Sequence, residues 1–205
     1  MLVREATGAD VDDVVALRIE SERWLHAAGV RQWTDRERGI RIIRDRIAAG
    51  GTYLVVDDDR AVVASLTLDH PDLDFWTKDD EPDAALYLYK FMITGRYRGT
   101  GLGDELLDWA CAQAQSQGKR WVRLDCWRDN LDLQQYYLDR GFAHVRTMVV
   151  EGRDSGALFQ RPATLRLAKS RYFSAVVVEA GVSLPRSARL GTTPTAALRD
   201  VEPGP

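Results

Sequence analysis

The sequence RGTGLG, residues 98–103, separates a long apolar run (85–93) from an amphipathic run (101–117). The first run predicts a central strand and the second predicts a helix. Glycines at such a turn let the backbone approach a ligand closely and adopt conformations closed to other residues. The unpaired N–H groups at the start of the helix favour a phosphate, and Arg98 adds a positive charge that pairs well with phosphate oxygens.

Several classes of phosphate site compete for a glycine-rich turn. A nucleotide P-loop needs Lys followed by Ser or Thr after the last glycine, but Asp104 and Glu105 follow here. A dinucleotide-binding turn needs G-x-G-x-x-G, which is one position longer than this spacing, although Asp125 would supply its acid. A hairpin and two helices before the glycines argue against that fold. A tight turn without a ligand is the remaining alternative.

Elements predicted on both sides of this turn outline a mixed α/β fold. The N-terminal part predicts a strand over 2–6, a helix ending at Gly29, a second helix from Thr34 or Asp35 to Gly50, and a hairpin over 52–56 and 61–68. After the helix over 101–117 come a strand (121–126), a helix (131–139), a strand (141–150) and a short strand (157–159). We expect one domain over residues 1–162 and an appendage over 163–205 whose end is disordered.

Composition indicates an ordinary globular protein. The 205 residues are 45% apolar and 29% charged with a formal net charge of -3, which argues against a nucleic-acid partner. The start lacks the pattern of a signal peptide and no apolar run is long enough for a membrane span, so we expect a cytoplasmic protein. Two cysteines and three scattered histidines predict no metal site.

Two patterns resemble signatures of the GNAT N-acetyltransferase family. The first is R/Q-x-x-G-x-G/A between the fourth strand and the third helix, filled here by Arg98, Gly101 and Gly103. The second is an Asn, a Tyr seven positions later and a Gly-Phe pair after four more, which here are Asn130, Tyr137, Gly141 and Phe142. The resemblance covers about residues 1–162.

The resemblance implies a GNAT fold, in which a mixed, mostly antiparallel sheet splays between strands four and five and is flanked by helices. It implies transfer of an acetyl group from acetyl-CoA to a primary amine of a small molecule or peptide, by direct attack in a ternary complex. The residues it assigns to the cofactor are Phe91, Ile93, Arg98, Gly99, Thr100, Gly101, Leu102, Gly103 and Asn130. Tyr137 is expected to protonate the leaving thiolate, unless its ring only packs in the core.

These patterns do not identify the general base or the residues of the acceptor pocket. Many relatives place a carboxylate on the fourth strand, but residues 85–93 contain none. The candidates for the base are Glu22, Asp69, Asp72 and Asp74. Four aromatic residues line the acceptor pocket or simply pack: Trp33, Phe75, Trp76 and Tyr89. The acidic loop over 72–83 suggests a cationic acceptor, or only a solvated loop.

Two other functions compete with catalysis. The chain could bind acetyl-CoA without turning it over, as a sensor, because the strand acid is missing. It could also be a dinucleotide-binding oxidoreductase, if the glycine turn belongs to that class. The resemblance is compatible with a monomer or a homodimer.

Overall fold

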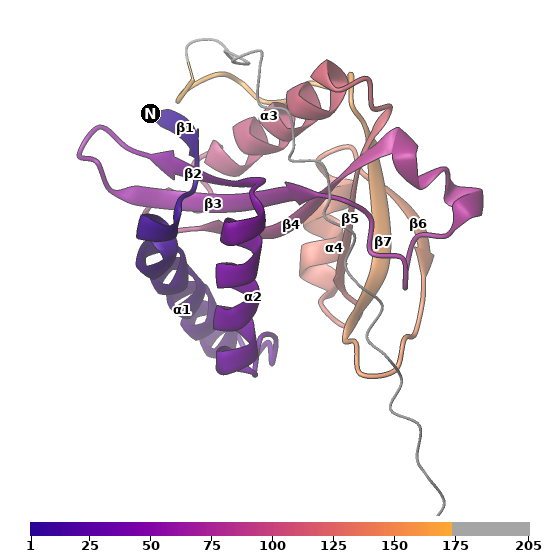
Figure 1. Ribbon diagram of the computed structural model, residues 1–205, viewed down its shortest axis with the longest axis horizontal. Coiled ribbons are helices and arrows are strands. Elements are labelled where there is room, and N and C mark those ends of the chain that lie inside the picture. The colour runs from indigo at the N-terminus through magenta and orange to yellow at the C-terminus, as the bar shows by residue number, and fades with distance from the viewer. Residues whose placement is uncertain (174–205) are drawn as a thin grey trace, which may run out of the picture.

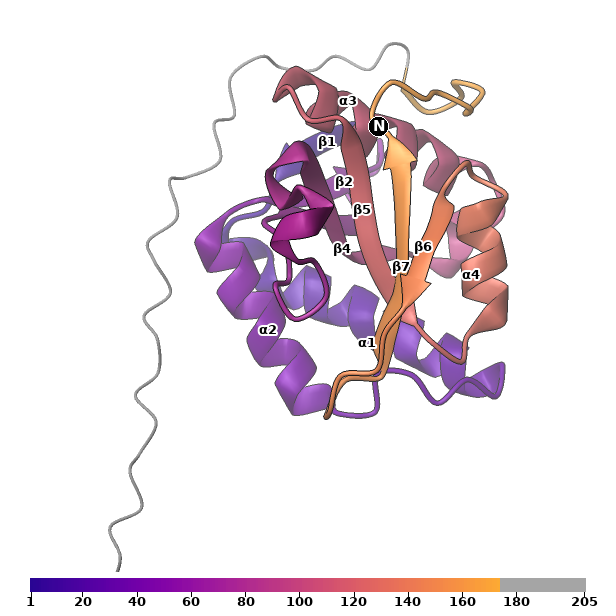
Figure 2. The same ribbon diagram turned by 90° about the vertical axis from the view of Figure 1, so that its right-hand side faces the viewer.

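The computed structural model describes residues 1–173, in which seven strands form one sheet in the order β1-β2-β3-β4-β5-β7-β6 (Figures 1 and 2). The strands are β1 (Leu2–Glu5), β2 (Thr52–Val56), β3 (Val62–Asp69), β4 (Ala85–Ile93), β5 (Trp121–Trp127), β6 (Ala143–Thr147) and β7 (Ser155–Pro162). The helices are α1 (Val11–Ala27), α2 (Arg36–Ala49), α3 (Leu102–Ser116) and α4 (Leu131–Leu138). The disorder predicted for the end of the appendage lies outside the described residues.

The predicted order of elements is confirmed, and so is the mixed, mostly antiparallel sheet. Strands β1 to β4 follow one another as antiparallel neighbours, and β5, β7 and β6 also pair antiparallel. Within the described residues only β4 and β5 pair in parallel. The doubly wound parallel sheet of a dinucleotide-binding fold is therefore excluded.

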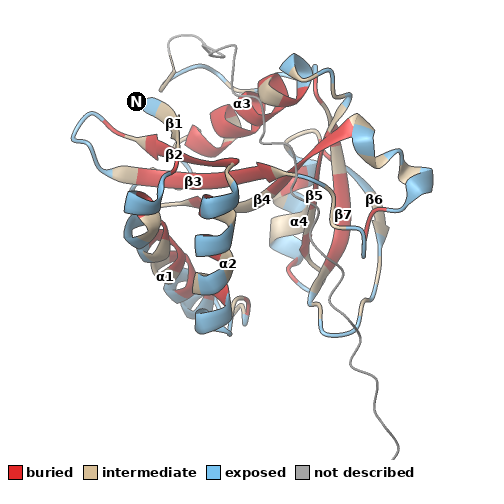
Figure 3. Ribbon diagram, viewed as in Figure 1, coloured by how far each residue is buried: buried red, intermediate tan, exposed pale blue. Residues whose placement is uncertain are grey.

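Helices cover both faces of the sheet. Helices α1 and α2 lie on one face, where Ile43 and Ile47 pack around Leu54 and Met92, and α3 lies on the other (Figure 1). Leu106 of α3 is fully buried in the largest apolar cluster, and the central strands are buried along most of their length (Figure 3). Burial of both sheet faces accounts for the continuous apolar run in β4.

A seam between β4 and β5 opens after three residue pairs. The two strands pair only from Ala85↔Trp121 to Tyr87↔Arg123, although β4 continues to Ile93. On its other edge β4 changes register against β3, and Lys90 has φ 50° at this bulge. The predicted splay between the fourth and fifth strands is confirmed, and it leaves one edge of β4 without a strand partner.

Strand β7 is longer than predicted and β6 is shorter. The short strand expected over 157–159 is an eight-residue strand between β5 and β6. Its Arg161 is 1% exposed, and Asp108 of α3 pairs with it at 2.5 Å. Strand β6 ends at Thr147. Val149 follows in the loop to β7 and is 82% exposed, so the apolar residues there do not continue the strand.

Residues 163–173 lie along α3, forming a segment that we call the strap. The buried carboxylate of Asp108 accepts backbone hydrogen bonds from Leu167 and Ala168, both at 2.8 Å. Glu105, one turn earlier on α3, accepts backbone hydrogen bonds from residues 171–173. Hydrogen bonds to a carboxylate are among the stronger ones, so the strap is attached firmly next to the glycine turn.

Candidate active site

The glycine turn adopts backbone conformations that favour glycine. Gly99 has φ 73° and Gly101 has φ 98°, and a Cβ atom at either position would meet nothing within 4 Å. Gly101 is the N-cap of α3, so Leu102 and Gly103 begin the helix and their N–H groups lack partners within it. An anion is favoured in front of these groups, where the helix dipole adds to the N–H donors.

The side chain of Arg98 is held against α1 and β4. Its Nε donates to the carbonyl oxygen of Ile93 at 3.0 Å, and its guanidinium lies 4.6 Å from the ring centroid of Trp24. Glu20 of α1 approaches the guanidinium at 3.6 Å and also accepts from the backbone N–H of Gly95. Arg98, predicted to assist a phosphate, thus connects the turn to α1 in this structure.

Phe91 and Ile93 meet Gly103 on the α3 side of the seam. A Cβ atom on Gly103 would lie 3.2 Å from Ile93 Cδ1 and 3.9 Å from Phe91, and only 2.6 Å from the hydroxyl oxygen of Tyr136. Arg140 stacks on the Tyr136 ring at 3.6 Å, which keeps that ring in place. The structure therefore brings three of the predicted cofactor residues together, and adds Tyr136, which the sequence patterns did not single out.

Asn130 stands at the start of α4 with both ends of its amide engaged. Its Oδ1 accepts from the backbone N–H of Leu133 at 3.0 Å, which caps the helix. Its Nδ2 donates to the side chain of Gln32 at 3.2 Å, between α1 and α2. Asn130 is 9% exposed, so this buried bond connects segments from the two halves of the chain.

Tyr137 lies in an aromatic cluster below β5. Its ring makes edge contacts with Tyr136 at 5.4 Å and Phe142 at 5.3 Å, and the residue is 7% exposed. Burial raises the pKa of its hydroxyl well above the ordinary value, so the group stays protonated over the physiological range. The ring of Tyr137 also contacts Phe159 of β7, at 6.2 Å between ring centroids.

On the α1 and α2 side, the seam carries polar side chains. Tyr89 donates from its hydroxyl to the carbonyl oxygen of His70 at 2.9 Å and lies 4.8 Å under the guanidinium of Arg46. Burial, then the nearby Arg18, lowers the pKa of Lys90 to about 8. Burial raises the pKa of Asp125 on β5. The sequence indicates Asp125 only as the acid of a dinucleotide-binding turn, and its place across the seam depends on strand pairing that spacing does not reveal.

Each of the four residues suggested as a base has an arginine partner. Glu22 pairs with Arg36 and Asp69 with Arg46. Asp72 and Asp74 both pair with Arg153, at 2.5 and 3.2 Å. Each of these four carboxylates is therefore already engaged in an ion pair.

The acidic loop is largely neutralised, and two of its aromatic residues belong to the core. Asp80 pairs with Arg146 at 2.7 Å. Phe75 and Trp76 are 0% and 1% exposed and pack with Tyr87, so for these two the packing interpretation holds. The suggestion of a cationic acceptor therefore loses most of its support.

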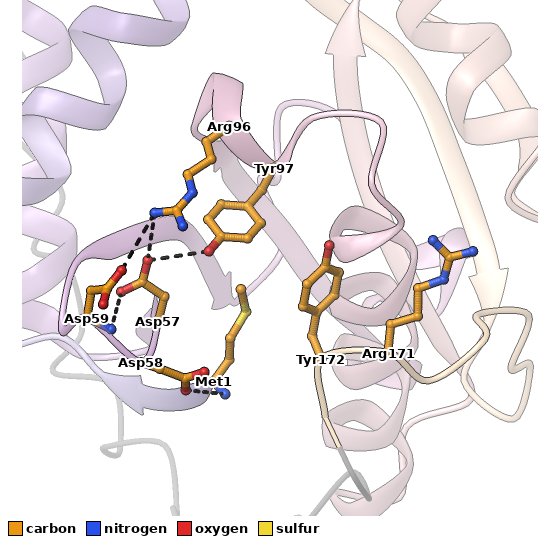
Figure 4. A pocket seen from close by; sticks show the side chains of 8 residues that line it. All are labelled: Met1, Asp57, Asp58, Asp59, Arg96, Tyr97, Arg171 and Tyr172. Carbon is orange, nitrogen blue, oxygen red and sulfur yellow. Dashed lines mark hydrogen bonds and ion pairs between the residues drawn. The ribbon is translucent and has the colours of Figure 1, made fainter.

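A surface hollow of about 370 Å³ is lined by Met1, the β2–β3 turn, the segment after β4 and the strap (Figure 4). Asp57 from the β2–β3 turn accepts from Tyr97 at 3.4 Å and pairs with Arg96 at 3.5 Å, and Arg171 and Tyr172 of the strap stand opposite (Figure 4). Asp58 and Asp59 also line it. Three aspartates make this hollow a poor site for a phosphate.

Other possible chemistry finds little support in the described residues 1–173. No group of three or more His, Cys, Asp or Glu side chains is arranged to hold a metal ion there. Burial raises the pKa of the Cys126 thiol to about 12, which makes it a poor nucleophile. In the same range no helix has the length and apolar character needed to cross a membrane.

Comparisons with known proteins show which family and fold this chain resembles. The chain is 28% identical over 138 residues to the uncharacterized N-acetyltransferase YesJ of Bacillus subtilis, covering 65% of this chain and 76% of that protein. A GNAT-family acetyltransferase structure from Listeria monocytogenes has 26% identity and a TM-score of 0.65, over 78% of this chain and 94% of that one. The PaiA N-acetyltransferase of Thermoplasma acidophilum, solved with coenzyme A, shares the fold at 16% identity and a TM-score of 0.58, over 79% and 99%.

The family model of the acetyltransferase (GNAT) family matches residues 16–142, which is more than half of the chain. The match runs from α1 to the Gly-Phe pair after α4 and so includes the glycine turn and the seam. The fold and the sequence similarity therefore agree, and this protein is an N-acetyltransferase of the GNAT family.

Proposed function

We propose that this enzyme transfers an acetyl group from acetyl-CoA to a primary amine by direct attack in one ternary complex. The observation that carries the proposal is the open seam, where β4 past Tyr87 has no partner on its β5 side and the glycine turn lies at its end. An amide-bearing chain such as the pantetheine arm matches an unpaired strand edge, because both offer N–H and C=O groups. The coenzyme A found in the Thermoplasma relative supports this choice of donor.

The residues of the turn fit the donor's phosphates. A Cβ atom at Gly99 or Gly101 would meet nothing within 4 Å, and these glycines directly precede the first N–H groups of α3, where an anion is favoured. Phe91 and Ile93 would hold the arm against Gly103, whose missing side chain keeps that route open. Acetyl-CoA would supply an activated acetyl thioester. Arg98 would contribute by fixing the turn or, after leaving Ile93, by direct contact with phosphate.

Tyr137 and Asp125 are suited to the two proton transfers. As the nitrogen–carbon bond forms and the carbon–sulfur bond breaks, sulfur needs a proton and nitrogen must lose one. The hydroxyl of Tyr137 is protonated and would donate this proton to the sulfur as the thiolate leaves. Asp125 faces the other side of the seam, and burial raises the pKa of its carboxyl toward that of a useful base.

Calorimetry and a turnover assay test the proposal. Native protein is expected to bind acetyl-CoA, and Gly101→Glu is expected to lose binding through backbone strain and charge repulsion. Gly8→Ala, at an open position, serves as the control. Free thiol released from acetyl-CoA with a panel of primary amines then measures turnover. Binding without turnover on any amine would favour a sensor over an enzyme, and no binding by folded protein would refute the donor.

A further inference from the structure

We propose that Arg171 of the strap binds a phosphate group of coenzyme A beside the glycine turn. The inference rests on the proposed function, because it adds a residue to the same donor site. The family match ends at residue 142, so Arg171 lies in a part of the chain beyond the matched region. The strap would then be part of the cofactor site as well as a structural segment.

The strap contacts the glycine turn and the residue just before it. The Nη1 atom of Arg171 donates to the carbonyl oxygen of Thr100 at 3.4 Å. The ring of Tyr172 makes an edge contact with the ring of Tyr97, with the centroids 5.9 Å apart. Thr100 is tied to Tyr97 as well, because its hydroxyl donates to the Tyr97 carbonyl oxygen at 2.8 Å. The guanidinium of Arg171 therefore lies next to the turn that would receive the donor's phosphates.

Glu105 fixes the backbone from which this side chain extends. Its carboxylate accepts from the backbone N–H groups of Arg171 at 2.7 Å, Tyr172 at 3.1 Å and Phe173 at 3.1 Å. Glu105 is 4% exposed and lies in the first turn of α3, the helix that begins at the glycine turn. Arg171 is thus attached to the helix whose first N–H groups would face the phosphate. Because its backbone is already held in place, less freedom is lost when its side chain binds a ligand.

Both acidic residues in the first turn of α3 are already engaged. Unpaired carboxylates at this place would repel a phosphate. Asp104 pairs with Arg140 at 2.5 Å. The three backbone N–H groups of the strap offset part of the charge of Glu105. The strap therefore weakens a repulsion at the turn and also brings a positive charge to it.

Arg171 has no carboxylate partner within the described residues 1–173, whereas two other arginines near the turn do have one. Arg96 pairs with Asp57 at 3.5 Å, and Glu20 approaches Arg98 at 3.6 Å. The guanidinium of Arg171 points away from the aspartates of the hollow (Figure 4). Its bond to the turn, at 3.4 Å, is long for a hydrogen bond to a carbonyl oxygen. The guanidinium therefore retains donors for phosphate oxygens, which arginine can bind with two parallel N–H groups.

Calorimetry with coenzyme A tests the inference, because this binding needs no acceptor amine. Native protein, Arg171→Met, Arg171→Lys and Arg166→Met would each be titrated with coenzyme A. Arg166 is the matched control, since it lies on the same strap but donates to Ala163, Leu165 and Gln115. We expect Arg171→Met to bind about tenfold more weakly, as for a lost hydrogen bond to a charged group. Arg171→Lys should keep part of the affinity, because lysine retains the charge without the paired donors.

A second ligand, dephospho-coenzyme A, identifies the phosphate that Arg171 binds. This molecule lacks the phosphate on the ribose and keeps the pyrophosphate. If the difference between native protein and Arg171→Met disappears with this ligand, Arg171 binds the ribose phosphate. If the difference is the same for both ligands, Arg171 binds the pyrophosphate. Either result supports the inference.

The outcomes separate this inference from the proposed function. Unaltered affinity of Arg171→Met for coenzyme A, or an equal loss in Arg166→Met, overturns the role of Arg171 and leaves the proposed function standing. Failure of folded native protein to bind coenzyme A refutes the proposed function itself. With any amine that native protein acetylates, Arg171→Met should raise the KM for acetyl-CoA and leave kcat unchanged. Thermal unfolding of each variant shows that a lost affinity does not reflect a lost fold.

Discussion

The hydroxyl oxygen of Tyr136 lies 2.6 Å from the point where a Cβ atom on Gly103 would stand. A real Cβ atom does not approach an oxygen so closely, so any residue larger than glycine at position 103 must displace the Tyr136 ring. That ring is clamped by Arg140, which in turn pairs with Asp104 at 2.5 Å. The absence of a side chain at Gly103 therefore allows three elements to pack closely: the first turn of α3, helix α4 and the end of β4.

We expect Gly103→Ala to weaken acetyl-CoA binding by about tenfold, because overpacking costs about 1–3 kcal/mol and the displaced ring narrows the route along Phe91 and Ile93. Calorimetry measures the change. Removing the clashing oxygen in the double variant with Tyr136→Phe should restore most of the affinity. Unaltered binding in Gly103→Ala would mean that the donor takes another path.

Tyr137→Phe should lower kcat by about a hundredfold, within the range typical of general acid–base catalysis. The ring contacts with Phe142 and Phe159 remain, so the thermal midpoint should change little. Tyr136→Phe is the matched control and should keep most of its kcat. Nearly native turnover by Tyr137→Phe would place the proton donor elsewhere and leave Tyr137 with a packing role.

Asp125→Asn should remove the acidic limb of the pH profile of kcat/KM. A base must be ionised, and burial raises the pKa of this carboxyl, so activity should fall as the pH drops through that raised value. The charges around it are Lys90, Arg153 and Asp72, and the first two together with Ser155 oppose the shift. A profile that keeps the same acidic limb in the variant would exclude Asp125 as its source.

Asp108→Asn should lower the free energy of unfolding by about 3 kcal/mol, since it leaves the fully buried Arg161 without a counter-charge. Denaturation by urea measures the loss. Asp104→Asn removes a half-exposed partner from Arg140 and should cost less than about 1 kcal/mol. Equal losses of unfolding free energy in the two variants would contradict the conclusion that burial makes the Asp108–Arg161 pair the more important one.

Asp80→Asn should destabilise the protein at neutral pH but not in acid. The hydrogen bond from Arg146 lowers the pKa of Asp80 from 3.8 to about 2. Because the folded pKa is the lower one, this stabilisation is present above about pH 4 and is lost as the pH falls through about 2. We expect a cost of about 1–2 kcal/mol at pH 7 after solvent screening. The exposed pair of Glu81 and Arg120 is the control, and Glu81→Gln should cost less than Asp80→Asn at pH 7 because exposed ion pairs stabilise little.

The local sequence pattern was sufficient to predict the helices and strands, but it did not predict which distant residues pair with one another. Strand β4 has the predicted limits because its apolar run is continuous, and α3 follows its glycines as expected. The length of β7 was not predicted because it depends on a buried arginine. Arg161 can lie in the buried part of this strand because Asp108 of α3 pairs with it. The strap was missed for a similar reason, since its partner Glu105 reads as a surface acid.

The site was only partly predictable for the same physical reason. Glycines in a turn indicate positive φ or close approach of the backbone, so the sequence alone identified residues 98–103 as a candidate phosphate site. Asp125 and Lys90 depend on where β5 lies beside β4 and on a one-residue bulge, and neither follows from spacing. A lysine in a strand ordinarily indicates an exposed edge, and its position in the seam emerges only in three dimensions.

Strand β7 leaves the ribosome after every other strand of the described residues, and it lies between β5 and β6. Strands β1 to β4 pair with chain neighbours, so this half can assemble while translation continues. The remaining half must wait for residues 155–162, because until then β5 has only three pairs with β4 to hold it. Nascent chains released before this point should therefore carry a folded first half and an incomplete site, exposed to chaperones and proteases.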